Sequence, residues 1–183
     1  MAPLLRGRFG RERYLYVEQC ESTQRLLGPD DPEGAVAVAD EQTSGRGRLG
    51  RVWIAPPRTS VLCSVLLRPR VAPARLPELT PLAGEAVAEA LRELGTEPTV
   101  KAPNDVLIAG RKVAGILGEA SEGPVVLGIG INVHQRRDEL PERAEFPATS
   151  LALETDSPPA RSAVLVTLLE MLERRYDRWL REL

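Results

Sequence analysis

Residues 99–133, TVKAPNDVLIAGRKVAGILGEASEGPVVLGIGINV, decide the fold class of this chain. The segment divides into short apolar runs that predict strands over 99–102, 106–108, 112–119 and 125–133. Ala109-Gly110 and Glu122-Gly123 lie between runs and are typical of tight turns. Strands joined by tight turns pair antiparallel, so this stretch predicts hairpins.

Two longer helices are predicted on either side of this block. Leu, Ala and Val recur at spacings of three and four over 79–94, and Gly95 ends the pattern. A similar apolar stripe covers 163–183. The N-terminal part predicts strands over 13–18, 35–39 and 60–67, with a short helix over 25–27. We therefore expect one α+β domain over 1–183, a mixed and largely antiparallel sheet packed against helices.

Composition and charge exclude several classes of protein. The chain of 183 residues is 43% hydrophobic and 27% charged, which is typical of a soluble globular domain. A net charge of −2 provides no overall basic field for DNA. No apolar run reaches the roughly 20 residues of a membrane span, and no secretion signal is evident. Cys20 and Cys63 are expected to be free thiols, and a cytoplasmic location with no membrane partner is expected.

The basic residues are strongly skewed toward arginine. Of 24 basic residues, 22 are Arg, and Lys occurs only at positions 101 and 112. Asn also occurs only twice, as Asn104 and Asn132. A composition that replaces Lys and Asn elsewhere suggests that these four serve particular chemistry, because a guanidinium cannot imitate a compact ammonium. All four lie between 101 and 132, although each could also be a solvated surface residue.

The strongest local motif is the stretch GRGRLGR at 45–51, followed by Trp53. Glycines allow a close backbone approach, and three arginines can neutralise phosphate oxygens. The order matches neither a dinucleotide-binding fingerprint nor a Walker loop. A flexible basic loop or an RNA-binding Arg-Gly segment is the alternative. The buried strands predicted on both sides favour a phosphate-binding connection, with Trp53 offering a flat face to a base.

Two further motifs lie in the hairpin block. Lys101-Ala102-Pro103-Asn104-Asp105 precedes the strand that begins near Lys112, so two ammonium groups and a carboxylate are expected close together, as suits a phosphate–metal site. The alternative is that Asn104-Asp105 only shapes a turn. In Gly128-Ile129-Gly130-Ile131-Asn132, the glycines and Asn132 share one strand face. That face leaves room for a ligand, or else for a crossing helix.

The remaining polar signals are weaker. Ser22-Thr23-Gln24 is either a helix N-cap or a set of small polar groups for a ligand. His134 is the only histidine, and it lacks neighbours that would complete a nucleophilic or metal arrangement. The sequence shows no Ser-His-Asp, Cys-His or zinc-ligand spacing. This favours a reaction whose nucleophile arrives with the substrate.

Taken in this order, the motifs resemble the catalytic domain of biotin protein ligases. That family carries Ser-Thr-Asn, Gly-Arg-Gly-Arg-x-Gly-Arg-x-Trp, Lys-Trp-Pro-Asn-Asp, Lys-x-x-Gly-Ile-Leu and Gly-Ile-Gly-x-Asn-Val. The matching segments here are 22–24, 45–53, 101–105, 112–117 and 128–133. The resemblance spans about 20 to 133, and the ordered set is far more specific than any single motif. It implies the biotinyl/lipoyl ligase catalytic fold, which is related to class II synthetases.

The resemblance also implies an ATP-dependent ligase that forms biotinyl-5'-AMP and transfers biotin to a lysine of a carrier protein. The implied biotin-binding residues are Ser22, Thr23, Gln24, Gln42, Arg46, Gly47, Arg48, Lys112 and Gly115. The implied nucleotide-binding residues are Arg46, Arg48, Arg51, Trp53, Lys101, Asn104 and Asn132. Lys112 and Arg48 are the implied catalytic residues, and Asp105 is the implied Mg²⁺ contact. ATP, Mg²⁺ and biotin are therefore expected as substrates and ion.

The chain departs from the family pattern in three ways. Gln24 stands where the family usually has Asn, which keeps the amide, and Ala102 stands where it has Trp, which is expected to alter the pocket wall. Neither an N-terminal winged-helix domain nor a C-terminal SH3-like domain is expected within these residues. The implied partner is the biotin carboxyl carrier protein of acetyl-CoA carboxylase, with no DNA partner and a possible homodimer.

Two alternatives to this function come from different classes. A lipoate or octanoate ligase or transferase of the same superfamily would share the fold and the acceptor-lysine chemistry. A non-catalytic protein that binds biotin or an adenylate would share the pocket without turnover.

Overall fold

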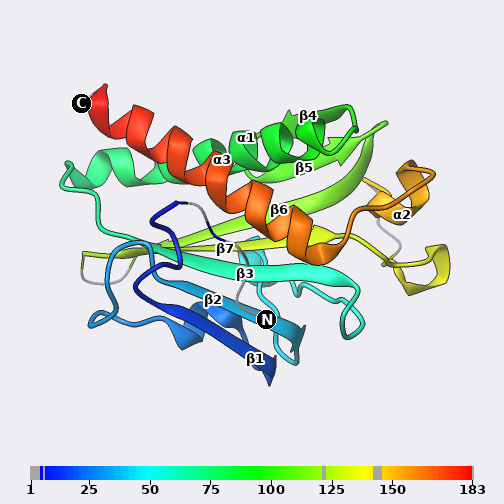
Figure 1. Ribbon diagram of the computed structural model, residues 1–183, viewed down its shortest axis with the longest axis horizontal. Coiled ribbons are helices and arrows are strands. Elements are labelled where there is room, and N and C mark those ends of the chain that lie inside the picture. The colour runs from blue at the N-terminus through cyan, green and yellow to red at the C-terminus, as the bar shows by residue number, and fades with distance from the viewer. Residues whose placement is uncertain (1–4, 6, 121–122, 142–145, 183) are drawn as a thin grey trace.

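A seven-stranded sheet organises the chain, with two long helices on one of its faces (Figure 1). The computed structural model describes residue 5 and residues 7–120, 123–141 and 146–182. The strand order is β1-β2-β3-β7-β6-β5-β4. The pair β1–β2 is parallel and every other pair is antiparallel. The predicted α+β class, with a mixed and largely antiparallel sheet, is confirmed.

The strands fall close to their predicted positions. They are β1 (Tyr14–Cys20), β2 (Val36–Gln42), β3 (Ser60–Leu67), β4 (Pro98–Lys101), β5 (Asp105–Ile108), β6 (Arg111–Ala120) and β7 (Val125–Asn132). Ala109 and Gly110 both have positive φ, as the tight turn between β5 and β6 requires. The other predicted turn includes Glu122, which lies outside the described residues.

The α-helices are α1 (Leu79–Glu93), α2 (Leu151–Glu154) and α3 (Arg161–Arg181). The 3₁₀ helices are η1 (Thr23–Leu26), η2 (Arg48–Gly50), η3 (Pro73–Glu78) and η4 (Arg137–Glu139). The predicted helix over 25–27 is thus a single 3₁₀ turn, because Gly28-Pro29 follows too soon for a longer helix. None of the helices in the described ranges has the length and apolar character needed to cross a membrane.

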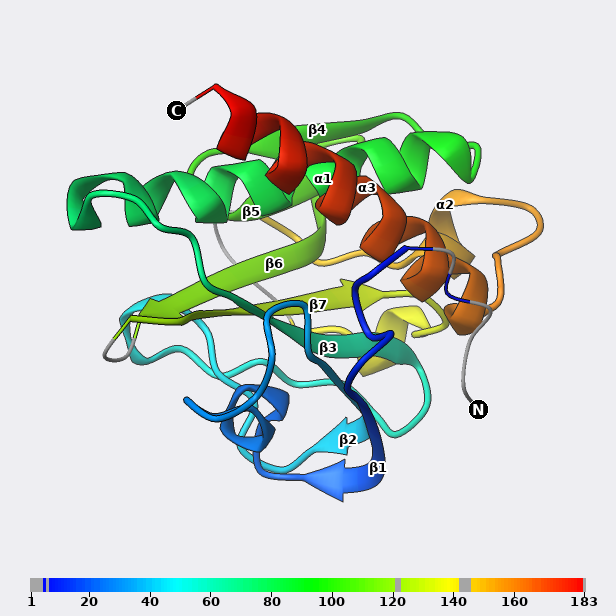
Figure 2. The same ribbon diagram turned by 60° about the vertical axis from the view of Figure 1, so that its left-hand side comes forward.

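The main core lies between the sheet and the pair α1–α3, which pack against each other above it (Figures 1 and 2). Ile129 and Ile131 point from β7 into this core. Every residue of β3 is buried, because the strand has neighbours on both sides and is covered on both faces. Alternation along β7 therefore turns Gly128, Gly130 and Asn132 to the opposite face.

Candidate active site

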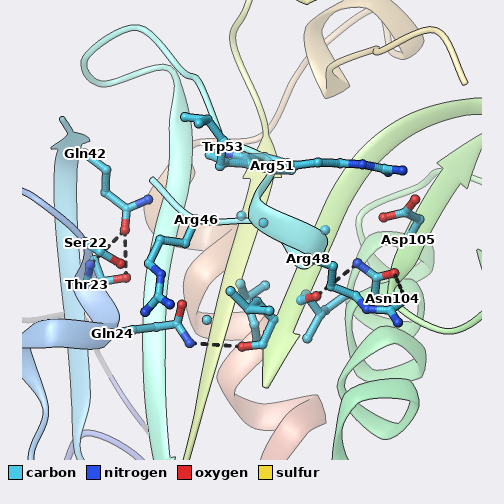
Figure 3. Close-up of a pocket in the computed structure, with 18 of the residues that line it drawn as sticks. Ser22, Thr23, Gln24, Gln42, Arg46, Arg48, Arg51, Trp53, Asn104 and Asp105 are labelled. Atoms are coloured by element: carbon cyan, nitrogen blue, oxygen red, sulfur yellow. Dashed lines mark hydrogen bonds between the residues drawn. The ribbon is translucent and has the colours of Figure 1, made fainter. Parts of the chain in front are cut away.

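A pocket of about 120 Å³ opens on the sheet face opposite the long helices (Figure 3). It lies where η1, the β5–β6 hairpin and residues 45–53, called the Gly-Arg loop below, meet. Except for Lys101 and Asn132, every residue proposed from the sequence lines it: Ser22, Thr23, Gln24, Gln42, Arg46, Gly47, Arg48, Arg51, Trp53, Asn104, Asp105, Lys112 and Gly115. Segments up to 108 positions apart in the chain, from Ser22 to Gly130, are thus brought to one place.

One end of the pocket is a buried set of paired polar groups. The backbone N–H of Thr23 donates to Gln42 Oε1 at 2.8 Å, and its hydroxyl donates to the same oxygen at 3.1 Å. The Thr23 hydroxyl also lies 2.8 Å from the Ser64 hydroxyl. Ser22 is 2% exposed and its side chain makes no cap bond to η1, so it does not serve as a conventional N-cap. Its hydroxyl is left for the pocket that it lines.

Gln24 extends this polar end across the sheet. Its Nε2 donates to the carbonyls of Leu117 at 3.2 Å and Val126 at 3.3 Å, so the amide spans β6 and β7. A Cβ at Gly128 would lie 2.8 Å from the Gln24 carboxamide carbon, so the side chain occupies the space that this glycine leaves. The longer amide is therefore accommodated by the bare strand face beneath it.

The indole of Trp53 covers the next glycines along the same face. A Cβ at Gly130 would come within 2.6 Å of the ring, and one at Gly115 within 3.0 Å. No crossing helix fills this face within the described part of the chain; Trp53 and Gln24 fill it instead. The Trp53 Nε1 is buried without a hydrogen-bond partner, and Lys112 Nζ lies 5.8 Å from the ring centre. The flat indole thus forms a wall beside the lysine.

The Gly-Arg loop is a small hairpin that extends from the sheet. Gly47 N–H donates to Arg51 O at 2.7 Å, and Trp53 N–H donates to Gly45 O at 3.0 Å. A Cβ at Gly45 would lie 2.4 Å from the Trp53 carbonyl oxygen, so only glycine permits this closure. At the tip, Leu49 has a φ of 58° in the left-handed region and is 86% exposed. The tip is therefore held by few contacts.

Positive charge dominates the other end of the pocket. Four cations and one carboxylate, Asp105, line the whole pocket. Lys112 is 9% exposed, and its Nζ lies 2.5 Å from Asp105 Oδ1. Arg48 donates to Asn104 Oδ1 at 3.2 Å, and Asn104 in turn donates to the Ile116 carbonyl. Since anions are attracted to several cations that line one pocket, and Lys112 among them is buried, this end suits a carboxylate and a phosphate.

The loop is anchored across the pocket mouth by one ion pair. Arg46 lies 2.7 Å from Glu119 on β6, with both side chains partly exposed. Glu119 did not emerge from the sequence, because one acidic residue at a strand end carries no pattern. Ser64 was also missed, although a hydroxyl within the apolar run SVLCSVLL of β3 was an available signal.

Two of the proposed residues lie outside this pocket. Lys101 is exposed at the end of β4, with its Nζ 5.9 Å from the centre of the Phe146 ring. Lys101 lies opposite Asp105 in the β4–β5 pair, but the ion pair with this carboxylate is formed by Lys112. Asn132 is buried in an adjoining small hollow that it shares with Trp53, Lys112 and Ala148. Ala102 is exposed and is absent from the pocket lining.

The pocket holds no activated nucleophile among the described residues. Cys63 is in the lining, but burial raises the pKa of its thiol to about 12, which leaves it protonated at neutral pH. His134 is exposed on the segment after β7. The described residues also contain no group of three His, Cys, Asp or Glu side chains that would hold a metal. The one carboxylate among the described lining residues, Asp105, is paired with Lys112.

The chain resembles a known family along most of this site. Residues 16–135 match the model of the Biotin/lipoate A/B protein ligase family. The "Bifunctional ligase/repressor BirA" of Bacillus subtilis is 38% identical over 175 residues, covering 90% of this chain and 54% of that protein. The "Biotin--[acetyl-CoA-carboxylase] ligase" of Mycobacterium tuberculosis is 40% identical over 160 residues, covering 85% and 59%. The chain thus spans somewhat more than half the length of these curated relatives.

A solved structure supports the same relationship in three dimensions. The biotin protein ligase from Aquifex aeolicus in complex with biotin and ATP superposes with a TM-score of 0.83. It is 35% identical, and the match covers 93% of this chain and 72% of that one.

Proposed function

The chain belongs to the biotin/lipoate A/B protein ligase family, and from this we propose that it activates biotin with ATP and transfers it to a carrier protein. The product of the first step is biotinyl-5'-AMP. The acceptor is a specific lysine of a biotin carboxyl carrier protein, as the name of the Mycobacterium tuberculosis relative indicates for that enzyme. The pocket supports both half-reactions through residues of contrasting character at its two ends.

The buried polar end is proposed to hold the ureido ring of biotin. That ring offers one carbonyl acceptor and two N–H donors, and it needs partners already in position once it leaves water. Ser22, Thr23 and Gln42 supply hydroxyl, amide and backbone groups in a fixed arrangement. Gln24 and Gly115 would border the bicyclic ring and the chain that follows it.

The cationic end is proposed to carry the adenylation. A biotin carboxylate oxygen attacks the α-phosphorus of ATP, the new P–O bond forms, and pyrophosphate leaves. Two anions must approach each other, and charge grows on the phosphoryl oxygens. Lys112 and Arg48 are the proposed catalytic residues because they place positive charge where this happens, with Arg46 and Gly47 over the carboxyl end.

The nucleotide is proposed to lie beyond Lys112. Trp53 and Asn132 would contact adenine, since both border the hollow next to Lys112. Arg51, Asn104 and the more distant Lys101 would support the phosphates. The described residues form no metal cage, so Mg²⁺ is proposed to enter as part of MgATP, with Asp105 as the only carboxylate in the lining that it would meet.

The second half-reaction requires protection from water. The mixed anhydride hydrolyses readily, and the exposed Gly-Arg loop is the segment that can fold over it. The amine of the acceptor lysine then attacks the biotinyl carbonyl, an amide bond forms, and AMP leaves. No enzyme nucleophile is needed, which agrees with the protonated Cys63 thiol.

The observation that carries this proposal is a single pocket with two unlike ends. At one end neutral side chains are already hydrogen-bonded to one another, and at the other end cations outnumber carboxylates. The test is to mix the purified protein with biotin, MgATP and a carrier domain, and to measure the carrier by mass spectrometry. We expect a gain of one biotinyl group that requires both ATP and the acceptor lysine. A carrier of unchanged mass under saturating substrates would contradict the proposal.

Two controls separate the rival functions. Replacing biotin with lipoate or octanoate in the ATP–pyrophosphate exchange assay tests whether the protein is a lipoate or octanoate ligase. Tight binding of biotinyl-adenylate with no biotin-dependent exchange would indicate a non-catalytic binding protein. The names of the relatives and the biotin complex of the solved neighbour favour biotin.

A further inference from the structure

A buried polar cluster is centred on Asn132 and lies outside the lining of the main pocket. Its members are less than 6% exposed: Ser60, Asn132, Gln135, Thr149 and Ser150. They come from β3, β7 and the segments that follow β7 and precede α2. Buried polar groups are costly unless paired, so such a cluster requires an explanation.

The carboxamide of Asn132 is held in one orientation by a backbone carbonyl. Asn132 Nδ2 donates to Thr149 O at 2.9 Å. A carbonyl oxygen only accepts, so this partner must face the NH₂ side of the amide. The carbonyl is itself fixed, because Thr149 N–H donates to Lys112 O at 2.8 Å and ties the segment to the start of β6.

Gln135 secures the other side of the same amide. Its Nε2 donates to Asn132 Oδ1 at 2.9 Å and to the Ser60 hydroxyl at 2.5 Å. Gln135 Oε1 is left buried without a partner. Turning the Gln135 amide over would direct that oxygen at Asn132 Oδ1, which is also an acceptor. The unpaired oxygen therefore persists because the donor must face Asn132.

Among the described residues, the bonds to Thr149 and Gln135 leave Asn132 with one N–H and one lone pair that have no partner. A donor and an acceptor side by side match the edge of adenine, which offers a ring-nitrogen acceptor beside its amino donor. Guanine presents the opposite order, a carbonyl acceptor beside a ring N–H. An asparagine that can turn over would pair with either base, whereas one that cannot discriminates between them.

We propose that Gln135 is a positioning residue that fixes Asn132 in the orientation that selects ATP over GTP. Gln135 is 1% exposed and lines neither the pocket nor the hollow beside Asn132, so it acts through Asn132 rather than on the nucleotide. This inference rests on the proposed function, in which Asn132 contacts the base.

The test compares biotin-dependent pyrophosphate exchange with ATP and with GTP. Gln135→Met keeps the length of the side chain and removes one of the two bonds that orient the Asn132 amide, which leaves only the bond to the Thr149 carbonyl and makes the turned orientation easier to reach. We expect the ratio of kcat/KM for ATP to that for GTP to fall about tenfold, with the KM for biotin unchanged. Gln135→Glu places only acceptors against Asn132 Oδ1, and a larger fall is expected. A ratio within about twofold of the unaltered protein in both variants would overturn the inference.

Ser150→Ala is the matched structural control. It removes a bond of 2.7 Å from the Ser150 hydroxyl to the Gln135 carbonyl in the same cluster, without touching the amide that faces Asn132. Its thermal midpoint should fall while the ATP to GTP ratio stays constant. An equal change in the ratio would show that general loosening, and not the orientation of Asn132, sets selectivity. Absence of any exchange by the unaltered protein would instead refute the proposed function.

A second measurement uses the unaltered protein and needs no variant to fold. The chain has six carboxamide side chains, two Asn and four Gln, so selective ¹⁵N labelling of asparagine reduces the NH₂ signals to those of Asn104 and Asn132. We expect its NH₂ signals to exchange slowly with solvent and to shift on addition of biotin with a non-hydrolysable ATP analogue, and not with the GTP analogue. Rapid exchange, or equal shifts with both analogues, would overturn the inference.

Discussion

The two ends of the pocket are built in opposite ways. At the buried end, Thr23, Gln42 and Ser64 already bond to one another, and their positions are fixed by η1, β2 and β3. At the loop end, Arg48 and Arg51 are exposed on a hairpin whose tip holds few contacts. Leu49, Val52 and Ile54 are among the large hydrophobic side chains left open to water, and all three lie in or beside this hairpin.

This contrast teaches which part of the reaction each end can serve. Recognition of a small neutral ring gains from groups that are already in place, because no ordering cost is paid on binding. Retention of an unstable adenylate needs a segment that moves, because substrates must enter before water is excluded. Lys112 lies where the two ends meet, buried like the first and charged like the second.

The largest expected effect is at that junction. Lys112→Ala should lower biotin-dependent pyrophosphate exchange by about 10³-fold, because none of the other described cations in the pocket lining is buried. Circular dichroism should show an intact fold. Lys101, the only other lysine, is exposed, so Lys101→Ala should lower exchange less than about tenfold. Similar losses in both variants would contradict the separate placement of the two lysines.

The next effect tests the rigidity of the buried end. Thr23→Val removes the hydroxyl that bonds Gln42 and Ser64 and leaves buried partners unpaired, at a cost of about 1–3 kcal/mol. The KM for biotin should rise about thirtyfold with kcat little changed. Thr43→Val, at an exposed threonine just beyond β2, is the control and should alter neither value. An unchanged KM for biotin in Thr23→Val would show that this end is not where the ring binds.

A smaller effect is expected from the loop end. Arg48→Gly should release biotinyl-adenylate about tenfold faster, as measured by free adenylate in the absence of carrier, because the loop loses a cation that faces the phosphate. Its free energy of unfolding should change little, since the side chain is exposed. Arg70→Gly, in an exposed connection, should retain the adenylate normally. Tight retention by Arg48→Gly would remove the loop from the proposed closure.

The smallest effect concerns the anchor of the loop. Glu119→Gln removes the ion pair with Arg46, and partly exposed pairs contribute at most about 1 kcal/mol. We expect a two- to threefold change (about 0.5 kcal/mol) in adenylate release that disappears at high salt. Glu21→Gln, which removes the exposed pair with Arg25, should have no effect. A tenfold or salt-independent change would mean that the pair holds the loop more firmly than its exposure indicates.

Much of the molecule followed from local pattern. The helix periodicity over 79–94 and the apolar run of β3 were predicted nearly to the residue, because both are set by burial of neighbouring side chains. The Gly-Arg motif also predicted a turn beside a ligand pocket, since glycines permit a close backbone approach and arginines attract anions. The scarcity of lysine also predicted a particular role for Lys112, and this residue is buried in the pocket lining.

The sequence by itself determined the strands and the helices, because these depend on periodicity and on backbone freedom over a few neighbouring positions. Its resemblance to biotin protein ligases indicated most of the residues that gather at one pocket. Only the tertiary structure decided which of two lysines meets Asp105, that Trp53 covers Gly130, and that Gln135 holds Asn132. These contacts join residues through the register of β3, β6 and β7 and through side-chain orientation, and no local spacing along the chain specifies either.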